Sequence, residues 1–225
     1  LQYYKAMFEA QQYIPLSRDH QWSFRTKLEL GYGQGYGNKN GYDFTLPFTE
    51  NFYGGGQNIR GFESRIIGPR AIFRSATFVP GVPDPIGGGS SFPTDPQNDT
   101  YNVSTRSIGG NAMAMLTLEL ITPTPFLKEE NRNSVRTSIF IDAGNVWDTE
   151  FDINRYANLV QLRSENSREP LLVDYSDPSL IRATAGVSVQ WISPMGPLTF
   201  SLAKIIKKYE GDLQENFSFN IGTTF

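Results

Sequence analysis

The chain has 225 residues, a formal net charge of −3, one histidine and no cysteine. The absence of cysteine excludes a disulfide framework and a cysteine-based zinc site, and the mildly acidic charge argues against a nucleic-acid-binding surface. The longest apolar run, Ala112–Leu116, is far shorter than the ~18 residues that a transmembrane helix needs, so a helical membrane protein is excluded.

Alternation of apolar and polar side chains with a period of two dominates the chain and is the signature of β-strands that bury one face. Strands of ~9–11 residues are long enough, when tilted, to cross the hydrocarbon of a membrane. The strand pattern starts at the first residues, which indicates a fragment or a processed form of a longer protein. Seven strands are predicted, at about residues 2–13, 20–32, 111–122, 134–146, 180–192, 197–204 and 215–225.

The predicted connections alternate between short and long. Short turns lie at 14–19, 123–133 and 193–196, and long loops lie at 33–110, 149–179 and 205–214. This alternation is typical of outer-membrane barrels, whose short turns are periplasmic. Bacterial barrels of this type have an even number of strands, so a count of seven indicates either missing strands or a count that is wrong by one.

The alternation alone also fits a soluble β-sandwich or an intracellular barrel, in which the apolar face would point inward. Two observations favour a membrane barrel with a polar interior. Aromatic residues gather near predicted strand ends, as they do at membrane interfaces; these are Trp22, Trp147, Trp191 and Phe225. The polar faces carry charges that a small dry core would hold only at a large desolvation cost; these are Arg25, Lys27, Glu29, Glu119, Arg136, Asp142 and Arg182.

The connection at 33–110 holds most of the glycines of the chain and lacks the alternation seen elsewhere. Loops longer than about 15 residues are usually functional or disordered, and one of this length has the reach to fold back into a barrel lumen. Its segment 51–62 reads Asn-Phe-Tyr-Gly-Gly-Gly-Gln-Asn-Ile-Arg-Gly-Phe. The simplest interpretation of this segment is a glycine-rich turn with one solvated arginine, Arg60.

A functional interpretation is a hairpin that presents Arg60 to carboxylates. Glu119 and Asp142 lie on the polar faces of two consecutive predicted strands, and a guanidinium binds carboxylates bidentately. Phe140 lies on the same face as Asp142 and would add a cation–π contact.

The segment Ile59-Arg60-Gly61-Phe62 resembles the lumen-loop motif of the BamA family of outer-membrane assembly factors, in which valine is common at the first position. The later matches follow in the order of that family and cover nearly the whole chain. They are the segments at 121–126 (ITPTPF), 142–148 (DAGNVWD), 190–198 (QWISPMGPL) and 217–225 (FSFNIGTTF).

The resemblance implies an all-β, antiparallel transmembrane barrel of sixteen strands that follows periplasmic POTRA domains. Residues 1–225 would be the C-terminal portion of this one domain and would hold its last seven strands, with the long loop at about 33–110 inside the lumen. The POTRA domains and the earlier strands would lie outside this chain. The resemblance also implies that Arg60 pairs inside the barrel with Glu119 and Asp142.

The last predicted strand carries a second group of candidate residues: Phe217, Phe219, Gly222 and Phe225. By the resemblance, this aromatic-ended strand is similar to the signal that marks outer-membrane proteins for assembly, and it pairs weakly with the first strand of the barrel to form a lateral gate. Glycine within a strand permits a bend or weakens pairing. An equally simple interpretation of Gly222 is that it leaves room for a neighbouring side chain.

The function implied by the resemblance is the insertion of β-barrel proteins into the bacterial outer membrane, without nucleotide or any other cofactor. The implied partners are unfolded outer-membrane proteins, the lipid bilayer with its lipopolysaccharide, and the accessory lipoproteins of the assembly complex; nucleic acid is not expected. The alternative within the same superfamily is a protein-translocating channel of the two-partner secretion type.

An enzyme is not expected, because signals of catalysis or metal binding are absent from the sequence. An outer-membrane hydrolase of the phospholipase type would need a serine–histidine pair, and the one histidine, His20, lies in a predicted periplasmic turn.

Overall fold

The computed structural model of the protein describes residues 2–18, 21–39, 41–75, 100–124, 134–156, 173–194 and 196–222, and the structural statements that follow refer to these residues. No helix within these ranges has the length and apolar character needed to span a membrane. The residues His20, Phe126 and Phe225, which the sequence singles out, lie outside the described residues.

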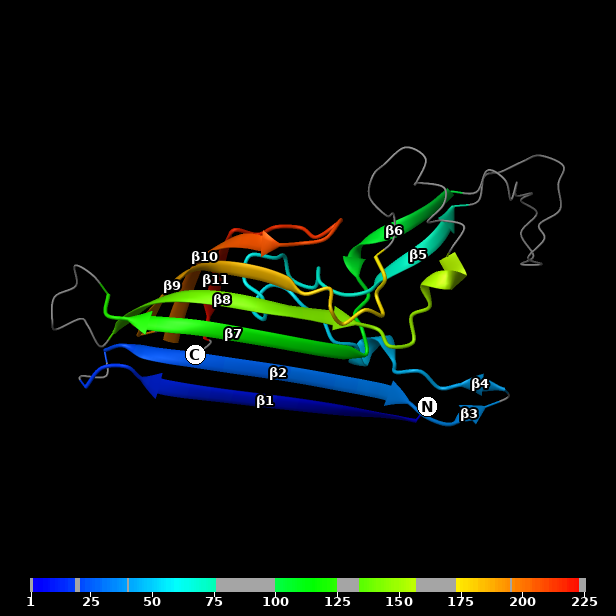
Figure 1. Ribbon diagram of the computed structural model, residues 1–225, viewed down its shortest axis with the longest axis horizontal. Helices are drawn as coiled ribbons and strands as arrows, with labels where there is room; N and C mark the ends of the chain where they lie inside the picture. Colours follow the sequence, from blue (N-terminus) through cyan, green and yellow to red (C-terminus); the bar gives the residue numbers. More distant parts are fainter. Residues whose placement is uncertain are drawn as a thin grey trace.

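Seven strands form one antiparallel sheet (Figure 1). This arrangement confirms the predicted all-β antiparallel fold. The sheet is open in this chain, with the first and last of the seven strands at its edges. In their order across the sheet, the strands are β1 (Tyr3–Pro15), β2 (Ser23–Gly35), β7 (Ala112–Thr122), β8 (Val135–Trp147), β9 (Arg182–Ser193), β10 (Gly196–Lys207) and β11 (Phe217–Ile221).

Where the residues are described, the predicted extents agree with the observed strands to within a few residues. The sequence predicts a last strand over 215–225; β11 spans 5 residues, Phe217–Ile221, and residues 223–225 of that prediction lie outside the described residues. Within the described residues β11 pairs with β10 from Phe217 to Ile221, so the strand begins two residues later than the sequence predicts.

The long connection at 33–110 contains structure of its own that the sequence pattern did not predict. Two hairpins lie in it, together with the short helix η1 (Phe48–Glu50). The first hairpin has strands too short to show a period, and the second has an irregular register between Arg70 and Ile72 that breaks the alternation. Figure 1 shows both hairpins and η3 (Ile153–Tyr156) at one end of the sheet. The hairpin strands are β3 (Asn38–Lys39), β4 (Tyr42–Asp43), β5 (Arg70–Ser75) and β6 (Thr100–Ser107).

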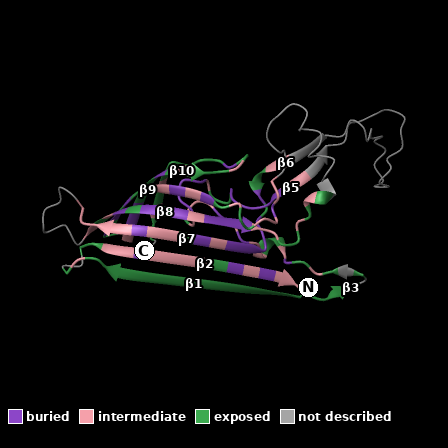
Figure 2. Ribbon diagram, in the orientation of Figure 1, coloured by how far each residue is buried: buried purple, intermediate pink, exposed green. Residues whose placement is uncertain are grey.

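The two faces of the sheet differ as the alternation predicts. The apolar face is bare: Val187 at the middle of β9 is 46% exposed, and Leu116 and Phe219 are also exposed. The polar face is covered by the long loop, and Asp142 on that face is 0% exposed. Figure 2 shows burial concentrated on β7, β8 and β9, with β1 exposed along its length. So large a bare apolar surface exceeds what soluble monomers expose and fits contact with lipid.

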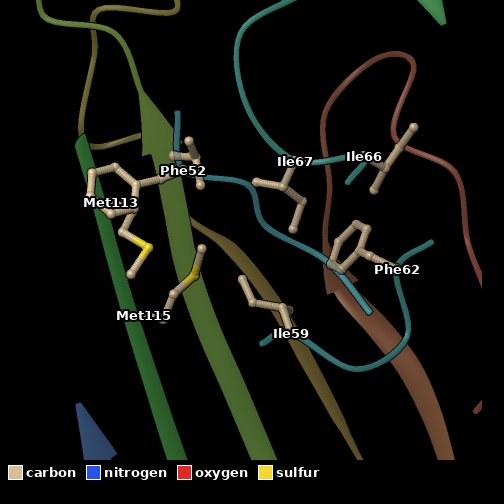
Figure 3. Packing of buried hydrophobic residues seen from close by; sticks show 8 residues of the cluster. Phe52, Ile59, Phe62, Ile66, Ile67, Met113 and Met115 are labelled. Atoms are coloured by element: carbon tan, nitrogen blue, oxygen red, sulfur yellow. The ribbon is translucent and has the colours of Figure 1, made fainter. Parts of the chain in front are cut away.

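The covered interior is only partly polar, which differs from the polar lumen that the sequence predicts. Met113 and Met115 of β7 and Val146 of β8 pack against the loop to form an apolar cluster (Figure 3). The reason is that one end of the inner sheet face carries apolar side chains where the loop crosses it. The loop contributes Phe52, Ile59, Phe62, Ile66 and Ile67.

The two faces should respond differently to an added charge. We expect Val187→Arg to lower the free energy of unfolding by about 2–4 kcal/mol, because it places a charge in lipid near the middle of a strand. Thr117→Arg is the matched control, since Thr117 lines an open polar cavity of about 270 Å³ on the inner face and should cost much less. Urea unfolding of the whole protein in lipid vesicles measures both; equal losses would contradict the assignment of the faces.

Candidate functional site: a buried arginine–carboxylate cluster

The lumen loop, which we define as residues 51–69, is fixed to the sheet end and folded into a hairpin by its backbone. Phe52 bridges Gly110, and Gly54 bridges Ile67. The hairpin is closed by the amide of Gly56, which donates to the carbonyl oxygen of Phe62 at 2.9 Å. This hairpin carries Arg60 at its inner end, against the sheet.

Asp142 of β8 accepts three hydrogen bonds from Arg60. Its Nε donates to Asp142 Oδ2 at 2.8 Å and its Nη2 donates to Asp142 Oδ1 at 2.9 Å. The backbone amide of Arg60 also donates to Oδ2, at 3.1 Å. Arg60 is 5% exposed and Asp142 is fully buried. Such bidentate, charge-assisted pairs are among the strongest hydrogen-bonded contacts in proteins, and they fix direction as well as distance.

Glu119 of β7 joins this pair to a second arginine. Arg60 Nη1 lies 3.5 Å from Glu119 Oε1, and Arg25 Nη1 of β2 donates to Glu119 Oε2 at 2.8 Å. The hydroxyl of Ser138 also donates to Glu119. The four buried charges therefore sum to zero, which is the condition under which burial of ions is tolerated.

The ring of Phe140 completes the surroundings of Arg60. The guanidinium carbon lies 3.4 Å from the ring centroid, within the range of a cation–π contact. Burial lowers the pKa of Arg60, but the hydrogen bonds with Asp142 and the charges of Asp142 and Glu119 outweigh burial and raise its pKa above the ordinary value. Arg60 is therefore a permanent cation.

Gly61 occupies a position that a larger residue could not fill. Its φ is +94°, a conformation that L side chains rarely adopt. A Cβ atom built there would lie 2.9 Å from the Cβ of Ala203 and 3.2 Å from Cγ2 of Thr184. The backbone of the motif thus lies directly against β9 and β10. Its neighbours in the motif, Ile59 and Phe62, are fully buried in the apolar cluster.

The predicted terminal residues form a separate group on β11. Phe217 and Phe219 are exposed on the outer face, and Phe219 lies beside Phe200 with ring centroids 4.9 Å apart. Gly222 has φ +81°, and its amide donates to the carbonyl of Pro197 at 2.8 Å. Among the described residues no atom lies within 4 Å of a Cβ built at Gly222, and the left-handed backbone there favours glycine.

The structure thus brings together the predicted residues Arg60, Glu119, Phe140 and Asp142, and it adds contacts that the sequence did not indicate. From the sequence alone, Arg25 is only a charge on a polar strand face. Its role follows from register, because Arg25 lies directly opposite Glu119 in the β2–β7 ladder. That ladder joins strands separated by the whole long loop, so sequence spacing gave no signal for it.

The fold and this site define a class: the wall of an outer-membrane type of β-barrel with a loop docked on its inner face. Residues 1–225 match the Omp85 superfamily domain, and the chain belongs to the Omp85 superfamily. This family and fold place the protein in the bacterial outer membrane.

Two relatives make the similarity more specific and agree with the resemblance to the BamA family. The chain is 34% identical over 229 residues to the outer membrane protein assembly factor BamA of Neisseria meningitidis serogroup B (strain ATCC BAA-335 / MC58), with 100% of this chain and 24% of that protein aligned. It also resembles the crystal structure of BamA from Haemophilus ducreyi lacking POTRA domains 1–3. The TM-score is 0.71 at 35% identity, covering 97% of this chain and 34% of that one. The chain therefore spans about a quarter of the length of the curated relative.

Removal of the Arg60 side chain should strongly destabilise the docked loop. We expect Arg60→Ala to lower the free energy of unfolding by about 3–5 kcal/mol, because two carboxylates remain buried with a single counter-charge. The control is Arg106→Ala on the same long connection: its side chain is 67% exposed beside Glu63, so its loss should cost at most about 1 kcal/mol. Urea unfolding of the whole protein in vesicles compares them, and a similar small loss for both would show that the buried pair contributes little.

Gly61→Ala tests the close approach of the motif to the wall. Gly41→Ala is its control, since Gly41 has a similar φ of +82° but nothing within 4 Å of a built Cβ. Both variants carry the left-handed strain of roughly 1–2 kcal/mol, and only Gly61→Ala adds the collision with Ala203. We expect added protease to cut the lumen loop faster in Gly61→Ala alone. Equal cleavage rates in the two variants would refute the steric explanation.

Proposed function

We propose that the chain is the C-terminal portion of the barrel of an assembly factor that folds and inserts β-barrel proteins into the outer membrane. Insertion takes place at a lateral seam beside β11 and uses no nucleotide. In this proposal the seven strands complete a sixteen-stranded barrel, and POTRA domains precede it. The proposal rests on the whole-chain similarity to a relative named as an outer-membrane protein assembly factor and on the way the sheet ends at β11.

The proposed position of the seam rests on the short β10–β11 ladder. β11 has 5 residues, whereas its neighbour β10 has 12 and β1 and β2 have 13 each. Unpaired backbone groups in lipid cost several kcal/mol each. A short edge strand therefore offers unsatisfied groups that an incoming strand can pair with, which is β-augmentation. The exposed Phe217 and Phe219 beside this edge provide an apolar surface for a client strand or for lipid.

The cluster around Arg60 has a supporting role in this proposal. It holds the lumen loop against β7, β8 and β9, so that the wall behind the seam keeps its shape while the edge strand exchanges partners. The proposed partners are unfolded outer-membrane proteins, the lipopolysaccharide-bearing bilayer and accessory lipoproteins of the assembly complex. Neither a cofactor nor nucleic acid takes part in the proposed insertion.

Photo-cross-linking of a client tests the seam. In the whole protein, reconstituted in vesicles with its accessory proteins, a photoreactive phenylalanine analogue replaces Phe219 on β11 or, as the control, Trp191 on β9. The two sites are exposed to the same extent, 46% and 45%. We expect a covalent adduct with an unfolded barrel client at position 219 and much less at 191, together with a client that becomes folded in the membrane.

Two other outcomes would contradict the proposal. Equal adducts at both positions would show that clients meet the barrel without using the β11 edge. A client recovered unfolded on the far side of the vesicle membrane would favour the protein-translocating channel of the same superfamily.

A further inference from the structure

The segment between β10 and β11 leaves the sheet instead of completing a hairpin. The β10–β11 ladder starts at the pair Leu202–Phe217, and the amide of Ala203 donates to the carbonyl of Asn216 at 2.8 Å. β10 itself continues to Lys207, but the returning chain does not follow it. Something other than β10 holds the returning segment, which we define as residues 208–216.

Asp212 is the point at which the returning segment is captured. From Lys204 to Gly222 every residue is described, and Asp212, at 6% exposure, is the one that is buried. Its Oδ2 accepts from Nε of Arg182 on β9 at 3.1 Å, and its Oδ1 lies 3.6 Å from Nη2 of Arg70 at the start of β5. Asp212 therefore joins the returning segment to the sheet wall and to the long loop at once.

The two arginines are themselves fixed by other contacts. Arg182 donates to Asn145 on β8 at 2.6 Å and lies 4.7 Å from the ring centroid of Tyr209. Arg70 donates to the carbonyl oxygen of Gly211 at 2.6 Å. Asp212 is thus held at a prepared site, since charged partners that are already oriented lose little freedom on pairing.

Beyond Asp212 the returning segment pairs with the lumen loop. The amide of Glu63 donates to the carbonyl of Leu213 at 3.1 Å, and the amide of Glu215 donates to the carbonyl of Gly61 at 3.0 Å. Phe62 and Gln214 form the bridge between them. The backbone of the motif around Arg60 therefore takes the place that β10 would otherwise occupy.

The sequence of the returning segment is also compatible with pairing along β10, which the structure does not contain. If the ladder continued in its present register, Lys204 would face Glu215. β10 bulges against β9 between Ile205 and Lys207, and an extended ladder that straightens this bulge would set Lys207 opposite Asp212. Ile206 would face Leu213, and both of these apolar side chains are exposed in the structure. Opposite charges and apolar pairs at facing positions stabilise antiparallel strands. The segment therefore has two possible neighbours, the lumen loop and β10.

We propose that Asp212 is a positioning residue that selects the first neighbour: its ion pairs with Arg182 and Arg70 hold the returning segment on the lumen loop. The β10–β11 ladder is kept short as a result. Without the ion pairs the segment shifts toward β10, the hairpin lengthens, and β11 is held more firmly. The inference concerns pairing within the chain, so it stands or falls separately from the proposed insertion activity.

A disulfide reports which neighbour is chosen. In the longer hairpin, with the bulge of β10 at Ile206 straightened, the facing residues 206 and 213 would form a non-hydrogen-bonded pair, because the Ala203–Asn216 bond places the hydrogen-bonded pairs at the alternate positions. Such pairs bring the two Cα atoms within the range of a disulfide. We introduce Ile206→Cys and Leu213→Cys into the whole protein in native membranes and measure the oxidised fraction after mild oxidation.

We expect a low oxidised fraction in the parent background and a rise of several-fold when Asp212→Asn is added. Arg70→Gln, which removes a partner of the captured state alone, should act in the same direction. Glu215→Gln is the control, since it neutralises an exposed carboxylate of the same segment and should leave the fraction low. Resistance of the folded barrel to unfolding by detergent on heating confirms that each variant is folded.

Three results would overturn the inference. The first is near-complete oxidation in the parent background, a result that does not depend on whether the Asp212 and Arg70 variants fold. The second is an unchanged fraction in the folded Asp212→Asn protein, or in folded Arg70→Gln if Asp212→Asn does not fold. The third is an equal rise with Glu215→Gln, which would reduce the effect to loss of net charge.

Discussion

The structure depends on the balance of charge inside the wall. The strands alone contribute Arg25, Glu119 and Asp142 to one buried site, which leaves an excess negative charge that only a cation from elsewhere can neutralise. Arg60 on the lumen loop is that cation. Because an uncompensated buried charge is far more costly than a surface one, the docked loop is part of the wall rather than an addition to it.

Apolar packing determines how closely the lumen loop approaches the inner face of the sheet. Ion pairs that leave water gain little net stability by themselves, so the cluster around Phe52, Ile59 and Phe62 provides the favourable burial that offsets desolvation. The ion pairs of Arg60 fix the orientation of the lumen loop, and the apolar cluster fixes its distance from the sheet. Both the ion pairs and the apolar packing depend on Gly61, because the lack of a side chain there lets the backbone of the motif lie against Ala203 and Thr184.

The sequence predicts features that depend on the alternation within a single strand. It does not predict contacts that depend on how distant parts of the chain pair. Strand extents followed from the period of two, and the partners of Arg60 followed from carboxylates on polar faces. Arg25 required the β2–β7 register across the long loop. Asp212 is a single acid in a segment read as a loop, and its burial depends on Arg182 and Arg70, which come from distant parts of the chain. The short extent of β11 likewise reflects a choice of neighbour, which alternation does not encode.

The same contacts explain where the sheet can yield. Opening a ladder requires its hydrogen bonds to break together, so long ladders resist and a ladder of five residues gives way first. The wall behind β11 is braced twice, by the cluster around Arg60 and by the ion pairs of Asp212. The cluster around Arg60 holds the lumen loop against the wall, and the ion pairs of Asp212 keep the returning segment on that loop and away from β10. In the proposed barrel the seam therefore opens at β11, because the interactions that stiffen the wall are the ones that deny this strand a longer ladder with β10.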